Sequence, residues 1–101
     1  SAGRLVSSGI QNTFIGGLAG DATTDADYNT AVGVGAMGTN QLGSRSTALG
    51  RNALTTQNPA TAVDMYNTAV GFGAGSSITT GTQNTFVGGL AGDATDDGLW
   101  G

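Results

Sequence analysis

A nine-residue segment recurs five times along this chain at a nearly constant interval, and this regularity restricts the fold more than any other feature. The copies begin at residues 12, 29, 46, 67 and 84 and read NTFIGGLAG, NTAVGVGAM, STALGRNAL, NTAVGFGAG and NTFVGGLAG. The steps between them are 17, 17, 21 and 17 residues. A fixed period of this length is typical of a solenoid, in which each repeat buries its surface against the next.

Three positions of the repeat are identical in every copy: a threonine, a glycine and an alanine. Gly and β-branched residues dominate the copies, and no apolar stripe with helical spacing persists, so strands are favoured over helices. We expect an all-β fold, a parallel β-solenoid in one domain over residues 1–101. A partial coil covers residues 1–11, and about five 17-residue coils start at the positions given above.

Alternate side chains of a strand face opposite sides, so each copy has two faces. One face carries threonine and an aliphatic residue, which we predict to fill the coil core: Thr13, Ile15, Thr30, Val32, Thr47, Leu49, Thr68, Val70, Thr85 and Val87. The other face carries a small or aromatic residue, which we predict to form an oligomer interface: Phe14, Ala31, Ala48, Ala69 and Phe86. Strands with two apolar faces are typically buried on both sides. We therefore expect self-association, with a homotrimer as the favoured state.

The connection between the third and fourth copies is four residues longer than the others. An insertion in a solenoid maps to a loop on one face, so residues 55–66 should bulge outward. Pro59 fits such a loop because it has no N–H for a ladder hydrogen bond.

The repeated NTAVG and STALG segments, followed by alanine, resemble the head repeats of YadA-type trimeric autotransporter adhesins. They are also similar to the NTALG-type repeats of phage tail fibres. The resemblance covers nearly the whole chain. It implies a left-handed parallel β-roll, three of which associate about an axis.

The chain contains no Cys, His, Lys or Glu, so the usual general bases and activated nucleophiles are missing. We expect no enzymatic activity and no thiolate metal site. The net charge of −4 argues against nucleic acid or an anionic membrane as a partner. No apolar run is long enough to span a bilayer.

Two groups of polar residues are candidate sites. Asp21, Asp25 and Asp27 could supply oxygens to calcium, although solvated turns in which each carboxylate bonds local amides are the preferred interpretation. We otherwise expect no cofactor. The repeated asparagines (Asn12, Asn29, Asn67 and Asn84) are expected to form a hydrogen-bonded ladder, with Ser46 as its weakest rung, and a polar ligand site is the alternative.

Two further alternatives concern the surface. The threonine column suggests comparison with ice-binding solenoids, but we expect these threonines to lie inside the coil. Aromatic residues can stack on sugars, which makes Tyr28, Tyr66, Phe72 and Trp100 candidates for glycan contact, with packing as the preferred role.

The favoured function is a structural segment of an extracellular fibre or phage tail fibre, on a cell surface or virion. The alternative is an adhesin or receptor-binding head that recognises a cell-surface glycan or protein, and an ice-binding solenoid is a third candidate. Residues 11–23 and 83–95 match at all but one position, so head-to-tail stacking of copies is also expected.

Overall fold

The computed structural model describes residues 1–93, which form short β-strands joined by turns. Trp100, one of the aromatic candidates, lies outside these residues. The strands are β1 (Thr13–Ile15), β2 (Thr30–Val32), β3 (Gly43–Ser44), β4 (Thr47–Leu49), β5 (Val63–Asp64), β6 (Thr68–Val70) and β7 (Thr85–Val87).

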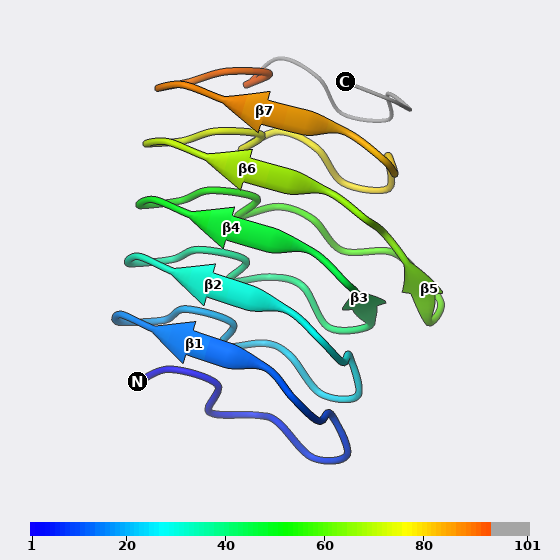
Figure 1. Cartoon of the computed structure of the whole chain (residues 1–101). Coiled ribbons are helices and arrows are strands. Elements are labelled where there is room, and N and C mark those ends of the chain that lie inside the picture. Colours follow the sequence, from blue (N-terminus) through cyan, green and yellow to red (C-terminus); the bar gives the residue numbers. More distant parts are fainter. Residues whose placement is uncertain (94–101) are drawn as a thin grey trace.

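Five of the strands stack as one parallel sheet in the order β1-β2-β4-β6-β7, with the chain completing one coil between successive strands. The register follows the sequence repeat, because each threonine pairs with the threonine of the next copy, as in Thr13↔Thr30 and Thr47↔Thr68. Four turns of about 17 residues therefore separate β1 from β7 (Figure 1). The predicted parallel β-solenoid is confirmed.

The invariant glycine follows each strand at a corner that only glycine can occupy. Gly33 has φ +132° and Gly50 has φ +135°, a region that L side chains avoid. A Cβ on Gly33 would also lie 2.6 Å from the backbone carbonyl of Gly50 in the next coil. Successive coils thus approach closely here, and this explains why glycine recurs at residues 16, 33, 50, 71 and 88.

The core of the solenoid is formed by small side chains, and this reverses the predicted faces of the strands. Ala31, Ala48 and Ala69 are fully buried, and Phe86 is almost so. The invariant alanines on the opposite wall pack against them, together with Met37, Leu54 and Ile78. The prediction that Phe14, Ala31, Ala48, Ala69 and Phe86 form an oligomer interface is wrong, because these residues line the inside of the coil.

The predicted core residues point outward instead. Thr13, Ile15, Thr47, Leu49, Thr85 and Val87 are exposed, and Thr30, Val32, Thr68 and Val70 are half-buried. The physical reason is the width of the coil. Each coil closes after about 17 residues around three-residue strands, so opposite walls lie close together and the strand positions between them accept mostly alanine.

The two phenylalanines fit inside because glycine replaces a larger residue opposite them. A Cβ on Gly20 would overlap the Phe14 ring, and one on Gly92 would overlap the Phe86 ring. Where the strand residue is Ala31 instead, the position equivalent to Gly20 is Met37, which is fully buried. In these coils a large side chain on one wall therefore faces a small one on the other.

The longer connection only partly bulges outward. Residues 60–64 are exposed, as predicted, but Gln57, Pro59 and Met65 are buried. Within the exposed part, β5 pairs in parallel with β3 and forms a second, two-stranded sheet. The insertion is thus a folded extension of the coil, and Pro59 belongs to its buried part.

Candidate functional site

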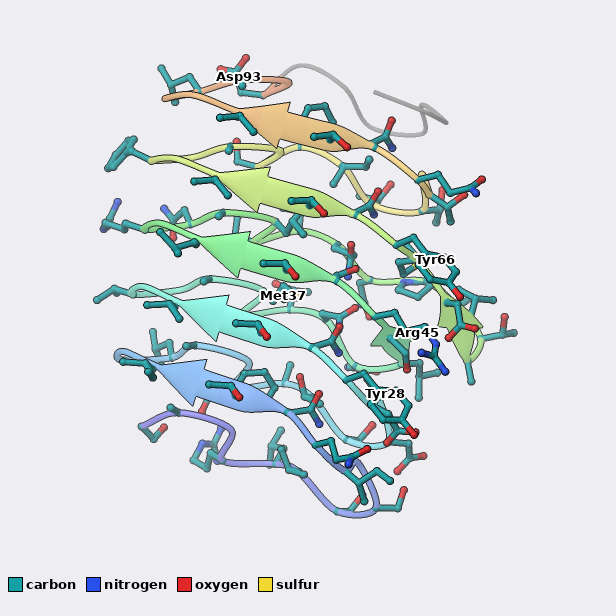
Figure 2. All side chains as sticks on the ribbon, in the orientation of Figure 1. Tyr28, Met37, Arg45, Tyr66 and Asp93 are labelled. Carbon is teal, nitrogen blue, oxygen red and sulfur yellow. The ribbon has the colours of Figure 1, made fainter. Side chains whose placement is uncertain are left out.

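The repeat creates a regular surface on the outward face of the five-stranded sheet, defined here as the side chains of the Thr and aliphatic columns. Ile15 is 59% exposed, Leu49 48% and Val87 69%. The threonines lie beside them in a parallel column, because both sets project from the same side of every strand (Figure 2). The five strands carry no charged residue.

The apolar surface continues past the ends of the strands. Val34 is 48% exposed and Phe72 57%, and each lies two residues beyond an aliphatic residue of the outward face. Arg51 occupies the same position in the intervening coil, with its Cζ 5.9 Å from the centroid of the Phe72 ring. Exposed apolar side chains gathered in this way are typical of a contact site for another molecule.

The predicted asparagine ladder is present, but each rung joins a side chain to backbone rather than to another side chain. The N–H of Asn29 donates to Oδ1 of Asn12 at 2.9 Å. The Asn29 side chain in turn accepts from the N–H of Ser46 and donates to the carbonyl of Gly43, at 2.9 and 2.8 Å. The asparagines therefore link neighbouring coils inside the solenoid, which leaves no room for the alternative polar ligand site.

Ser46 interrupts the ladder, and Gln57 from the longer coil fills the gap. The Gln57 Oε1 accepts from the Ser46 hydroxyl at 3.3 Å and from Nδ2 of Asn67 at 2.8 Å. Its Nε2 donates to Oδ1 of Asn40 at 3.2 Å. Every buried side-chain nitrogen and oxygen in residues 1–93 has a hydrogen-bond partner. The sequence identified the weak rung but not the residue that compensates for it.

The three aspartates that are candidate calcium ligands each accept hydrogen bonds from a different residue. Asp21 accepts from the Ser1 hydroxyl at 2.9 Å, and Asp25 accepts from the Ser8 hydroxyl at 2.7 Å. Asp27 accepts from the backbone N–H of Ile10 at 2.8 Å. Residues 1–93 contain no group of three or more acidic side chains that could hold a metal ion. These aspartates instead tie the first, partial coil to the second.

These hydrogen bonds lower the pKa of two of the carboxyl groups. Donation from Ser1, assisted by the backbone and guanidinium of Arg4, holds the pKa of Asp21 below its usual value of 3.8. Donation from Ser8 and Ser7 lowers the pKa of Asp25 in the same way. Both groups stabilise the fold as carboxylates.

A corner precedes each residue of the asparagine column, Ser46 included. It is occupied by Gln11, Tyr28, Arg45, Tyr66 and Gln83, all exposed and all with φ between 55° and 62°. The Arg45 Cζ lies 4.6 Å from the centroid of the Tyr28 ring, and its Nε lies 3.1 Å from Oδ1 of Asp64 (Figure 2). Sequence reasoning singled out the two tyrosines but missed Asp64, which the exposed part of the insertion brings to this corner.

Comparisons of the chain with protein-family models, curated proteins and solved structures gave no match. Within residues 1–93 no helix is long and apolar enough to cross a bilayer. This part of the chain also encloses no pocket. Two surfaces of these residues are candidate contact sites: the outward face and the tyrosine-bearing corner.

Proposed function

We propose that this chain is a non-catalytic structural segment of an extracellular fibre or phage tail fibre, in which copies pack together through the outward face. The observation that carries the proposal is the exposure of an in-register aliphatic column on a sheet without charged residues. Burying each of these side chains against a partner is favourable by roughly 1.5–3 kcal/mol when exposure is complete.

The oligomer that we propose is a homotrimer of left-handed rolls, as the resemblance to YadA-type and tail-fibre repeats implies. The sequence argument for self-association was that each strand has a second apolar face besides the one inside the coil. That argument still applies, but the two faces have exchanged their roles. The alanine column fills the coil, and the Thr and aliphatic column meets the other copies. Threonine suits this position because its methyl group packs while its hydroxyl bonds to a neighbouring chain or to water.

The mechanical part of the function follows from the ladders. Every coil from β1 to β7 is joined to the next by backbone hydrogen bonds on the sheet and at the glycine corner, and the internal asparagines add a link at each step except the one after Ser46. Four turns at about 4.8 Å each give a rise of roughly 19 Å from β1 to β7. Edge strands β1 and β7 carry matching sequences, which supports the further proposal that copies stack head to tail.

Oligomer mass tests this function directly. Light scattering should give about 29 kDa for the trimer of this 9.8 kDa chain. A double change of Leu49→Asp and Val70→Asp places two carboxylates on the outward face and should yield a folded monomer. Thr39→Asp, at an exposed position off the face, is the matched control and should remain trimeric. A monomeric wild-type chain would overturn the proposed packing.

Ice binding is a second candidate, because the structure places the threonine column outside rather than inside the coil. Threonines in register at about 4.8 Å intervals, exposed in β1, β4 and β7 and half-buried in β2 and β6, form a regular array beside the aliphatic column. Both functions need the same face, so they exclude each other. A monomer that inhibits ice recrystallisation, and loses this activity with Thr47→Lys, would support ice binding. An inactive trimer would support the fibre.

A further inference from the structure

The solenoid departs from its own repeat mainly at one corner. Arg45 replaces the tyrosine or glutamine of the other coils, Ser46 replaces asparagine, and the longer connection 55–66 emerges beside them. Insertions in solenoids often mark the face that binds a partner. Because the buried part of this insertion is explained by the Gln57 hydrogen bonds, its exposed part, residues 60–64, needs a separate account.

Three side chains of different chemistry lie on this corner in neighbouring coils. Arg45 offers hydrogen-bond donors and Asp64 offers acceptors, with 44% and 50% of their side chains exposed. Tyr66 is 54% exposed and lies one coil beyond Arg45 at the equivalent position. Tyr28 lies one coil before Arg45, and its ring stacks against the guanidinium. The ring of Tyr28 therefore helps to position Arg45.

The arrangement contributes little to folding. An exposed ion pair such as Arg45–Asp64 is worth about 0–1 kcal/mol, because water screens both charges. Glutamine occupies the same backbone conformation at Gln11 and Gln83, so neither an aromatic ring nor a guanidinium is required by the corner. The residue types at Arg45 and Tyr66 are therefore not dictated by the backbone of the corner.

We propose that Tyr66, Arg45 and Asp64 form a shallow binding site for a neutral saccharide. The apolar C–H face of a hexose stacks on the Tyr66 ring, while two adjacent hydroxyls bond to the paired groups, one accepting from Arg45 and one donating to Asp64. A neutral sugar is favoured over an acidic one because Asp64 already compensates Arg45 and the chain carries a net charge of −4.

This site does not depend on the proposed self-association. Arg45 and Tyr66 lie at the corner before β4 and β6, and Asp64 lies in β5 of the second sheet, whereas the outward face is formed by the five-stranded sheet. In a fibre, several copies would present the same site, so weak individual contacts would add up through multivalency.

An NMR titration of the intact chain with cellohexaose, maltohexaose and chitohexaose at millimolar concentration tests the proposal. At least one of these sugars should shift the amide signals of Arg45, Asp64, Tyr66 and the exposed segment 60–64. Tyr66→Gln and Arg45→Gln should each weaken binding at least tenfold. Gln11→Tyr is the control, because it adds a tyrosine at an equivalent corner without a neighbouring ion pair and should leave binding unchanged.

Light scattering of each variant keeps this result separate from the fibre proposal, because glutamine at the corner should not alter the oligomer mass. The proposal is wrong if none of the three sugars shifts these signals. It is also wrong if Gln11→Tyr strengthens binding as much as Tyr66→Gln weakens it, since stacking would then be nonspecific. Tighter binding of a sulfated or uronic acid oligosaccharide would overturn the preference for a neutral ligand.

Discussion

Oδ1 of Asn67 accepts a hydrogen bond from the backbone N–H of Asn84 at 2.9 Å, while its Nδ2 donates to Gly81 and Gln57 at 2.8 Å each. One buried side chain thus joins two coils and the compensating glutamine. Since its hydrogen-bonding groups cannot be replaced by water inside the coil, this asparagine is central to stability.

We predict that Asn67→Ala lowers the free energy of unfolding by about 3 kcal/mol or more, because it leaves several buried backbone and side-chain groups without partners. Urea unfolding followed by circular dichroism measures the loss. Gln11→Ala removes an exposed amide from a neighbouring column and should change stability by less than about 0.5 kcal/mol. Equal effects of the two changes would show that the ladder is not a major source of stability.

Ser46 and Gln57 should be energetically coupled. Ser46→Asn places a longer side chain where the Gln57 amide lies and should destabilise the chain, as should Gln57→Ala, which empties a buried site. The double variant should recover at least about 1 kcal/mol relative to the sum of the single changes. A double-mutant cycle in urea checks this expectation, and strict additivity would contradict the role assigned to Gln57.

Gly33→Ala should be strongly destabilising, by more than about 2 kcal/mol, because φ +132° is unfavourable for alanine and the new Cβ would meet the Gly50 backbone. Gly17 provides a matched control, because it directly follows Gly16, the residue equivalent to Gly33 one coil earlier. A Cβ on Gly17 would meet nothing within 4 Å, so Gly17→Ala should be neutral within about 0.5 kcal/mol. Thermal unfolding of both variants measures the difference.

Substitutions at Phe14 and Gly20 should be tolerated only when both residues are changed together. Gly20→Met alone would overlap the Phe14 ring, and Phe14→Ala alone would leave a cavity. The double variant Phe14→Ala with Gly20→Met reproduces the observed pair Ala31 and Met37, and Met37 already tolerates φ 49°. We expect the double variant to be more stable than either single variant by thermal unfolding. A double variant as unstable as the worse single change would argue against this packing rule.

Stability should fall as the solution is acidified below about pH 4. The folded-state pKa values of Asp21 and Asp25 lie below 3.8, so folding favours their carboxylates. Their contribution is present above the unfolded pKa and is lost as pH falls through the folded values. Melting temperatures between pH 6 and 2.5 measure the loss, and the Asp21→Asn, Asp25→Asn double variant should show a shallower decline. An unchanged slope would mean that these contacts do not depend on charge.

The repeat predicted the coils, the strand positions and the pairing register, because stacking identical segments in parallel places like residues side by side. It did not reveal which face of the strand closes the coil. Both faces are apolar or small, so periodicity alone cannot separate them. Side-chain volume would have been the better guide, since a short coil has space for Ala48 but not for Leu49 among its neighbours.

The corner site was only partly accessible from the sequence. Tyr28 and Tyr66 stand out because each precedes the repeated motif, whereas Asp64 lies within the insertion, where no period relates it to Arg45. The role of Gln57 was missed for the same reason, because this residue also lies within the insertion. One available signal was that the single serine in the asparagine column coincides with the single long connection.

The pairing of β4 with β6 joins Thr47 to Thr68 in the usual register even though 21 rather than 17 residues separate them. The rise per coil therefore stays the same although this coil is longer. The extra residues leave the stack after Pro59 and re-enter it at Met65. A peptide grafted between Ala60 and Val63 would be displayed at a fixed height along the stack of coils, so the fold offers a built-in position for presenting a foreign sequence.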